Sequence, residues 1–459
     1  MLETLRIQNF KSWQDTGTIQ FGALTGFFGT NSSGKTSILQ FLLMLKQTVE
    51  SSDRARILHL GDENSYVELG TLHDVIHNHA DPGKIDFGLS WTSSTYLKFE
   101  DMEGVGDNSR KDAINIKYEF VSAISQHNNL TQLIFFYYER DDWQVGVRQS
   151  IPSDNSNEPY QLVNKIHTCA TTEESPFGFQ KPIKFYGFPN EVLSVFRNPS
   201  GLQDLVYELE DFFSRCYYLG PLREYPRRLY SWAGEQTDGV GNRGERAVAA
   251  LLSSRQEGRT ISDSVGKQPK HTLEQHIAYW LKKLGLIHSF AVRPIAPNRK
   301  EYEVRVQKTP DSAEVFITDV GFGVSQLLPV LVLLFYVPEG SAIILEQPEI
   351  HLHPAVQAGL ADVMLDAIKR RNVQIILESH SEYLLHRLQT RLAEEVIPAD
   401  KVKLYFTKFE KEASEMTALD LDEYGNIRNW PKNFFGDQFG EAAARMEQEL
   451  KRRQAAGEK

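Results

Sequence analysis

The stretch GALTGFFGTNSSGKTSILQFLLML, Gly22–Leu45, decides how this chain folds. Its first part is an apolar run typical of a buried strand that ends at Gly29. After Lys35 the apolar residues recur at helical spacing, and residues 29–36 fit the pattern G-x-x-x-x-G-K-[ST] in full. The stretch therefore predicts a strand, a glycine loop and a helix in succession.

The glycine loop has the composition of a phosphate-binding loop. Gly29 and Gly34 let the backbone turn so that several N–H groups point at phosphate oxygens, and the following helix adds its positive N-terminal end. Lys35 is expected to neutralise the β- and γ-phosphates, and Thr36 to ligate Mg²⁺. We therefore predict ATP and Mg²⁺ as ligands, bound by Gly29, Asn31, Ser32, Ser33, Gly34, Lys35, Thr36 and Ser37.

The second half of the chain repeats the alternation of strands and helices from about Tyr302, which implies parallel strands with crossover helices. The segment DVGFGVSQLLPVL places Gly321, Gly323 and Ser325 just before a helix, ahead of a strand that ends at Glu346. Glycine N–H groups and a serine hydroxyl at a helix N-terminus suit a γ-phosphate, although a simple helix cap is the alternative. His380 directly follows the next buried strand, VQIILES.

This order of motifs resembles ABC-type ATPases of the RecF and overcoming-lysogenisation-defect (OLD) group, over residues 1–70 and 215–435. The opening LRIQNFKSW and the segments PEIHLHP and ESHSEYLL support the resemblance. It implies an α/β fold: an ABC-type P-loop ATPase head, with a mixed sheet of parallel core strands, flanking helices, a large β-rich and helical insertion, and no long coiled coil. The ending DEYGNIRNWPKNFF resembles a segment of uncharacterised function on bacterial AAA-family ATPases, several of them in anti-phage defence operons.

The resemblance also implies roles for individual residues. Lys11 and Ser12 would belong to the nucleotide site, and His380 would contact the γ-phosphate. The signature residues Gly321, Gly323 and Ser325 would meet the γ-phosphate of a second subunit, so that a homodimer sandwiches ATP. The expected divisions are residues 1–85 and 301–400 for the two halves of the head, 86–214 for an insertion with antiparallel strands, 215–300 for a helical connection and 401–459 for the C-terminal segment.

The acidic strand departs from the usual pattern, because ABC-type ATPases present Asp-Glu where this chain has Glu346 and Gln347. Glu346 would be the Mg²⁺-side acid, and Gln347 would occupy the general-base position. A glutamine cannot take a proton but can orient water, which predicts slow hydrolysis. Glu349 or Glu378 could supply the base or be structural, and a glutamine introduced to trap bound ATP would give the same sequence. The expected catalytic residues are Lys35, Glu346, Gln347 and His380, and the expected metal ligands are Thr36 and Glu346.

Three other features of the sequence offer alternative sites. His351 and His353 could bind a metal together with Glu349, but contact with an opposite subunit is the better interpretation. The acids of residues 420–423 are the sole candidates for a nuclease site of the kind that follows the ATPase in OLD proteins, and a turn explains them better. The acids Glu139, Asp141 and Asp142 match no nuclease spacing.

Composition narrows the functional class. The chain has 459 residues, a net charge of −11, 41% hydrophobic residues and two cysteines, without a leader or an apolar run that could span a membrane. We expect a cytoplasmic protein that does not contact membranes or coat nucleic acid by bulk charge, although basic loops around Arg223, Arg227 and Arg228 and around Arg243 and Arg246 could contact phosphates.

These features together predict an ATP-dependent dimeric switch that controls a separate effector, such as a nuclease, in anti-phage defence. The alternative is a RecF-like repair ATPase that binds DNA directly. A third hypothesis, a scaffold that does not hydrolyse ATP, requires that nucleotide cause no change.

Overall fold

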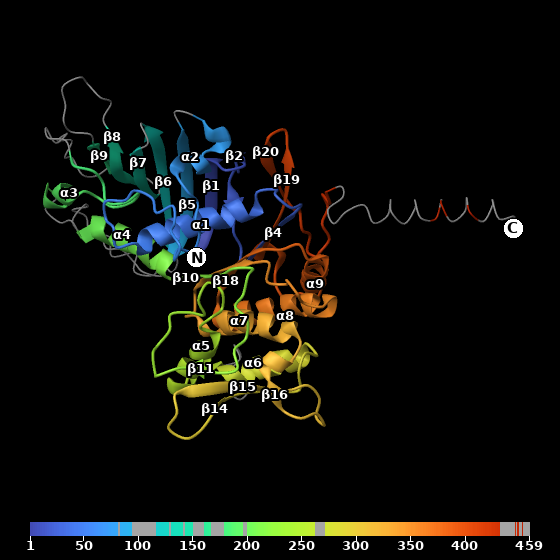
Figure 1. Ribbon diagram of the computed structural model, residues 1–459. Coiled ribbons are helices and arrows are strands. Elements are labelled where there is room, and N and C mark those ends of the chain that lie inside the picture. Colours follow the sequence, from blue (N-terminus) through green and yellow to red (C-terminus); the bar gives the residue numbers. More distant parts are fainter. Residues whose placement is uncertain are drawn as a thin grey trace, which may run out of the picture.

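The computed structural model describes residues 1–80, 83–93, 116–127, 130–140, 143–149, 160–166, 179–195, 200–261 and 271–431, with single positions at 446, 448 and 452. Figure 1 shows an upper sheet, a central sheet that crosses the middle of the molecule, and a lower group of helices. The two large sheets and the helices between and below them form the body that carries the predicted site.

The central sheet has six strands in the order β10-β17-β18-β4-β19-β20. Its first five strands run parallel, and only β20 is antiparallel, to β19. The phosphate-loop strand β4 therefore lies between β18 and β19, and β18 separates it from the acidic strand β17. The bounds are β10 (Cys216–Leu219), β17 (Ala342–Glu346), β18 (Gln374–Glu378), β4 (Leu24–Gly29), β19 (Val402–Glu410) and β20 (Ala413–Ala418).

The parallel strands are covered on both faces, which explains their continuous apolar sequences. Successive side chains of β17 point to opposite faces of the sheet. Ile343 and Leu345 join the core on the side of the lower helices, whereas Ala342 and Ile344 join the core beneath the upper sheet. One strand thus connects two hydrophobic cores.

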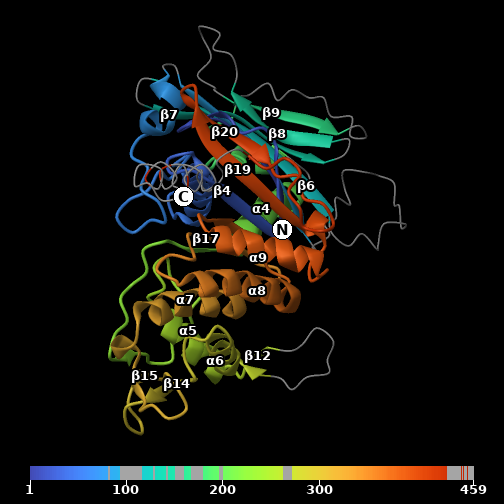
Figure 2. The same cartoon turned by 90° about the vertical axis from the view of Figure 1, so that its right-hand side faces the viewer.

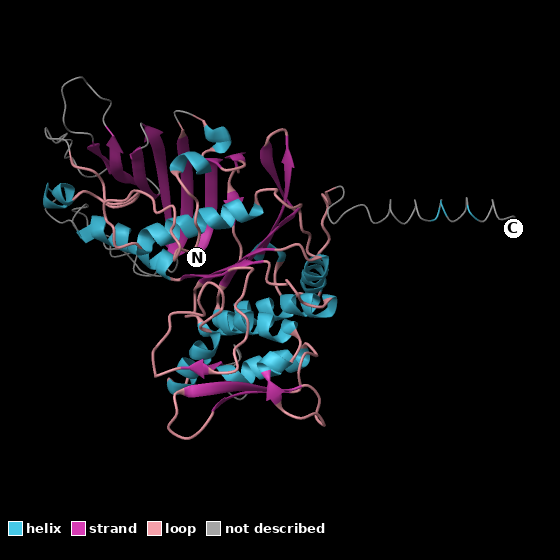
Figure 3. Ribbon diagram, in the orientation of Figure 1, coloured by secondary structure: helices cyan, strands magenta, loops and turns pink. Residues whose placement is uncertain are grey.

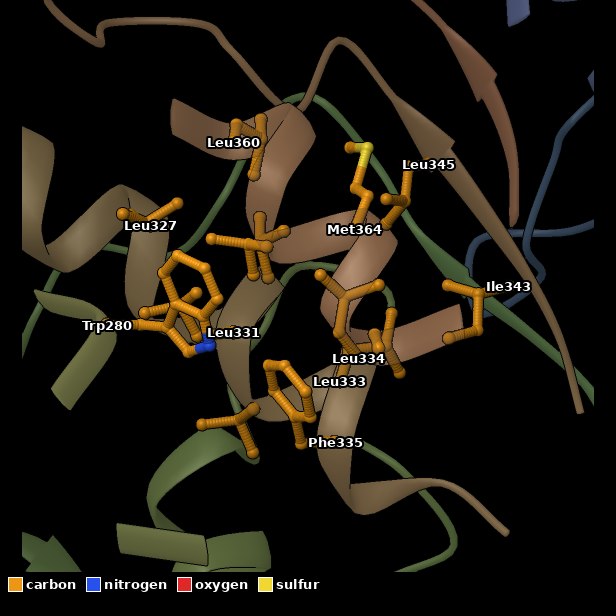
Figure 4. Close-up of a cluster of buried hydrophobic side chains, with 14 of the residues drawn as sticks. Trp280, Leu327, Leu331, Leu333, Leu334, Phe335, Ile343, Leu345, Leu360 and Met364 are labelled. Atoms are coloured by element: carbon orange, nitrogen blue, oxygen red, sulfur yellow. The ribbon is translucent and has the colours of Figure 1, made fainter. Parts of the chain in front are cut away.

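The lower core is built on α7, whose side chains from Val324 to Tyr336 are all buried. A helix that is apolar on every face must be surrounded by other elements. Figure 4 shows Trp280 of α6 beside Leu331 of α7, and Met364 of α8 beside Leu345 of β17. The helices of this layer are α5 (Ala247–Gln256), α6 (Leu273–Lys283), α7 (Phe322–Tyr336), α8 (Pro354–Arg371) and α9 (Glu382–Ala393). Beside them lie β11 (Tyr230–Ser231), β12 (Thr260–Ile261), β13 (His271–Thr272), β14 (Ser289–Pro294), β15 (Glu301–Gln307), β16 (Val315–Phe316) and the 3-10 turns η3 (Ile317–Asp319) and η4 (Ala399–Lys401).

The upper core contains α1 (Lys35–Glu50) and α4 (Ser200–Ser214), which pack with residues of both large sheets. The upper sheet is antiparallel throughout and contains the strands predicted for the insertion. Figure 3 shows how these strands form the upper part of the molecule. The remaining bounds are β1 (Leu2–Phe10), β2 (Trp13–Asp15), β3 (Ile19–Gln20), β5 (Lys84–Ser93), β6 (Ile116–His127), β7 (Leu130–Arg140), β8 (Trp143–Gln149), β9 (Tyr160–Ile166), α2 (Leu72–Val75), η1 (His77–His79) and α3 (Asn190–Val195).

This architecture confirms the predicted fold class: a mixed sheet with parallel core strands, flanking helices and a β-rich insertion. Among the described residues the longest helix is α8, with 18 residues, so this part of the chain holds no long coiled coil. The described part also has no helix with both the length and the apolarity needed to cross a bilayer.

Two strand pairings cross the divisions expected from the sequence. β1 pairs with β5, with Ile7 opposite Phe87, so the opening strand and the insertion share one sheet. β19 pairs with β4, with Tyr405 opposite Phe27, and Figure 2 shows the two strands side by side. The segment after residue 401 therefore begins with a strand of the central sheet.

Candidate functional site

A pocket of 480 Å³ lies at the carboxyl ends of β4, β17 and β18. Ligands of open α/β sheets bind at this edge, because the loops that follow parallel strands meet there. Another cavity, of 350 Å³, lies beside Trp232 and Tyr302 and contains none of the predicted site residues. The pocket at the sheet edge is lined by Ser12, Asn31, Ser32, Ser33, Gly34, Lys35, Thr36, Ser37, Gln347, Glu378 and His380.

The glycine loop needs its two glycines for steric reasons. Gly34 has a φ of +89°, and a Cβ there would lie 2.5 Å from Ser414 Oγ and 2.8 Å from Trp13 Nε1. Gly29 has a φ of +143°, and a Cβ there would lie 2.1 Å from the Thr407 carbonyl oxygen. Residues of neighbouring strands thus pack so closely against the loop that a side chain at either glycine position would collide with them.

Residues remote in the sequence hold the loop in place. Trp13 Nε1 donates to the Gly34 carbonyl oxygen at 2.9 Å, and Ser33 Oγ lies 2.6 Å from Thr407 Oγ1. Ser414 Oγ donates to Ser12 Oγ at 2.7 Å on the outer side of the loop. Sequence reasoning missed Trp13, Thr407 and Ser414, because none of them belongs to a motif and only the packing of β2, β19 and β20 on the loop reveals them.

The side chain of Lys35 folds back onto the glycine loop that precedes it. Its Nζ donates to the carbonyl oxygens of Thr30 at 2.7 Å and Gly29 at 3.2 Å. Burial lowers the pKa of Lys35, while the carboxylates of Glu378 and Glu349 act in the opposite direction. An anion in the pocket would therefore give this ammonium group a stronger partner than two neutral carbonyls.

Two acids end neighbouring strands but face different surroundings. Glu346 and Glu378 are Cα partners across β17 and β18. Glu378 lines the pocket, and its Oε2 accepts a hydrogen bond from Thr36 Oγ1 at 2.8 Å. Glu346 does not line the pocket, and its carboxyl group is hydrogen-bonded to the side chain of Tyr218. The acid beside the expected metal ligand Thr36 is thus Glu378.

Gln347 faces the pocket with a φ of +42°, an uncommon backbone conformation for a residue with a side chain. Its backbone N–H donates to the Glu378 carbonyl oxygen at 2.9 Å, and its side chain is hydrogen-bonded to the Glu378 carboxylate. Burial raises the pKa of Glu378, and the hydrogen bonds from Thr36 and Gln347 partly offset this. The backbone therefore directs Gln347 toward the same space as Lys35 and Thr36.

Glu349 fixes the loop that carries His380. Its Oε1 accepts from Ser379 Oγ at 2.8 Å and from the His380 backbone N–H at 2.7 Å. Glu349 is buried and lies outside the pocket lining, which favours a positioning role over the base role considered for it. Loss of hydration, with the Lys35 charge second, lowers the pKa of His380, which favours the neutral form of its imidazole.

The signature residues lie apart from this pocket. Gly321 is the N-cap of α7, Gly323 is in its first turn, and Ser325 Oγ donates to the Phe322 carbonyl oxygen at 2.8 Å. None of the three lines the pocket, whereas Phe322 between them is 37% exposed. Lys11 is also outside the lining, because its Nζ donates to Gln40 Oε1 at 2.5 Å.

The two histidines after the acidic strand have structural contacts. His353 is the N-cap of α8 and accepts from the Ala355 backbone N–H, and the His351 ring packs edge-on against Phe322 at 5.2 Å. Within the described residues, no group of three or more His, Cys, Asp or Glu side chains is placed to hold a metal. This geometry favours a packing role for both histidines.

Glu346 should make the free energy of unfolding of the nucleotide-free protein depend on pH. Burial, with the Glu378 carboxylate second, raises the pKa of Glu346 from 4.5 to about 7. The folded protein therefore keeps a proton that the unfolded chain has lost, and the free energy of unfolding falls as the pH rises from about 4.5 to about 7. We expect Glu346→Gln to remove this loss, worth up to about 3 kcal/mol. Urea unfolding at about pH 5 and pH 8 measures it, and an equal pH dependence in mutant and wild type would contradict it.

Comparison with known proteins gives matches over nearly the whole chain. The family described as "AAA domain, putative AbiEii toxin, Type IV TA system" matches residues 24–386, and a protein of unknown function (DUF3696) matches residues 397–444. No curated protein matches the chain.

Among solved structures, an Smc head bound to the C-terminal winged-helix domain of ScpA is 11% identical, with a TM-score of 0.44 over 92% of this chain and 98% of that one. The SMC head domain from Thermotoga maritima is 12% identical, with a TM-score of 0.40 over 91% and 99% of the two chains. An Smc head with an extended coiled coil, bound to the C-terminal domain of ScpA from Pyrococcus furiosus, is 10% identical, with a TM-score of 0.42 over 98% and 99%.

Proposed function

Because the chain belongs to the family described as "AAA domain, putative AbiEii toxin, Type IV TA system", an AAA/ABC-type ATPase family, we propose that it is a slowly hydrolysing ATP-dependent dimeric switch. The switch controls a separate effector in bacterial anti-phage defence. The pocket carries the proposal, because Lys35, Thr36, Gln347 and His380 from three segments of the chain face one 480 Å³ space. The family description names a toxin, which is compatible with a defence role.

The oxygen donors of the pocket fit Mg²⁺. The Thr36 hydroxyl and the Glu378 carboxylate are 2.8 Å apart and both line the pocket, and hard oxygen ligands are those that Mg²⁺ prefers in phosphate sites. When bound, Mg²⁺ would neutralise phosphate charge. Lys35 adds a positive charge on the loop side, and Gln347 can hold a water by its amide, which supports ATP binding with slow turnover.

The exposed start of α7 supports the dimer. The N-terminus of a helix attracts anions, yet this one does not face the pocket of its own chain. A second copy would bring its γ-phosphate to Gly321, Gly323 and Ser325 and complete the site. ATP therefore acts as the bridge between two subunits, and its loss releases them.

We expect ATP with Mg²⁺ to drive dimerisation, and Gly321→Arg to prevent it. A Cβ at Gly321 has no atom within 4 Å, so an arginine fits the monomer but obstructs a partner. Ser325→Arg should also weaken the dimer, but Ser325 is buried and its replacement could disturb the helix. Sedimentation with a non-hydrolysable ATP analogue measures the oligomer, and Tyr207→Arg, at an exposed position on α4, is the matched control. Equal oligomer size with and without nucleotide in the wild type would remove the sandwich mechanism.

Direct DNA binding has less support than the switch. Two arginines of the basic loop that was expected to contact phosphates form ion pairs within the protein. Arg227 pairs with Glu224 at 2.5 Å, and Arg228 pairs with Asp319 at 3.0 Å. Arg223 is buried and reaches the Gln347 carbonyl oxygen at 3.4 Å. The positive charges of Arg227 and Arg228 are thus neutralised by neighbouring carboxylates, and Arg223 is not on the surface.

The proposed switch cuts no nucleic acid by itself. Asp422 accepts backbone N–H groups from Tyr424 and Asn426, as expected for an acidic turn, and Glu139 is hydrogen-bonded to Gln144. Asp141 and Asp142 lie outside the described residues. We expect no cleavage of plasmid, single-stranded DNA or RNA by the purified protein with ATP and Mg²⁺ or Mn²⁺. Cleavage that survives repurification and is lost on mutating acids of this chain would contradict the separate effector.

A further inference from the structure

We infer that Glu378 of β18, and not Glu346 of β17, is the carboxylate that faces the metal ion of bound Mg·ATP. The inference rests on the proposed ATP site and deepens it. The sequence pattern favours Glu346, because it occupies the acid position of the strand that precedes the PEIHLHP segment. The contacts of the two side chains favour Glu378.

The first argument is the position of the two strands. β18 lies between β17 and the phosphate-loop strand β4, with Glu378 opposite both Glu346 and Phe27. Neighbouring strands are about 4.8 Å apart, so Glu346 starts one strand farther from the loop than Glu378 does. An acid on β18 therefore reaches the side of the pocket where Thr36 lies.

The second argument is the set of partners that each acid already has. Thr36 Oγ1 donates to Glu378 Oε2 at 2.8 Å, so the two groups expected to share an ion are already neighbours. Glu346 is hydrogen-bonded to the Tyr218 side chain and does not line the pocket. Of these two acids, Glu378 is the one that combines access to the pocket with a contact to Thr36.

The third argument concerns Gln347, the residue that departs from the ABC pattern. Its side-chain amide is hydrogen-bonded to the Glu378 carboxylate. An amide can donate to a carboxylate, whereas an ionised glutamate at position 347 would repel it. The amide at position 347 is therefore compatible with a carboxylate at position 378 that faces the pocket.

The test measures metal affinity rather than turnover. Mn²⁺ binding to the complex with a non-hydrolysable ATP analogue is followed by electron paramagnetic resonance, in wild type, Glu378→Gln and Glu346→Gln. We expect Glu378→Gln to weaken Mn²⁺ binding about 10–100-fold, the range found when groups that hold or orient a metal are removed. Glu346→Gln should leave it nearly unchanged, because Glu346 does not line the pocket and the hydrogen bond from Thr36 goes to Glu378. Glu378→Asp, which keeps the charge but shortens the side chain, should fall between wild type and Glu378→Gln.

Binding of the same analogue in EDTA separates the possible failures. Without metal, Glu346→Gln should bind it as the wild type does, and neither Glu378 variant should bind it more weakly, because neither adds negative charge to the pocket. Binding by each variant also shows that it is folded. Absence of analogue binding by the wild type would refute the ATP site itself. If the analogue binds normally but Glu346→Gln loses Mn²⁺ affinity, either alone or as much as Glu378→Gln does, the assignment of Glu378 is wrong. The ATP site itself would not be contradicted by this result.

Discussion

Replacing Gln347 with glutamate should raise the steady-state ATPase rate about 10²–10⁴-fold, the usual contribution of a general base. Gln347 faces the pocket, and the new carboxyl group would take its place beside Lys35 and His380. The nearby acids Glu346 and Glu378 would raise the pKa of that carboxyl toward neutrality, where a general base works best. Phosphate release at saturating ATP is the measurement.

Two controls decide what the rate change means. Gln347→Ala removes the amide without adding a base, and its rate should not exceed that of the wild type. An unchanged rate in Gln347→Glu would show that the base lies elsewhere. Loss of activity in Glu349→Gln would not identify that base, because Glu349 holds the His380 loop in place.

Replacing Lys35 with alanine should weaken ATP binding about 10–150-fold. Hydrogen bonds to charged groups contribute about 1.5–3 kcal/mol each, and every 1.4 kcal/mol is tenfold in affinity. Equilibrium titration with a fluorescent ATP analogue measures this change. Lys84→Ala is the matched control, because Lys84 is a partly exposed lysine of β5 that does not line the pocket.

The stability of the nucleotide-free protein separates binding from folding in the Lys35 experiment. Burial lowers the pKa of Lys35, which means that the folded state disfavours its charged form. Thermal unfolding of Lys35→Ala without nucleotide should therefore show a midpoint no lower than that of the wild type. A lower midpoint together with weaker binding would indicate that the loop had collapsed, and the affinity loss could then not be assigned to the missing charge.

The fold was largely predictable because its signals are local. The glycine pattern, the apolar run that ends at Gly29 and the helical spacing after Lys35 each involve residues close in sequence, so β4, the loop and α1 follow from them. The alternating strands and helices after Tyr302 predicted a sheet with parallel strands, as observed for β17 and β18. The pairing of β1 with β5 of the insertion could not be predicted in this way, because it joins Ile7 to Phe87, eighty residues farther along the chain.

The sequence by itself determined the kind of site: a phosphate loop with a lysine and a hydroxyl at Lys35 and Thr36, an amide where a base is usual, and a histidine after a buried strand. Only the tertiary structure decided which acid lies beside Thr36, because strand order and not sequence order puts β18 between β17 and β4. It also decided what holds the loop, since Trp13, Thr407 and Ser414 reach it through strands far apart in the chain. A motif records which groups are present within a few residues, whereas the distance between groups on different strands depends on how the whole sheet is assembled.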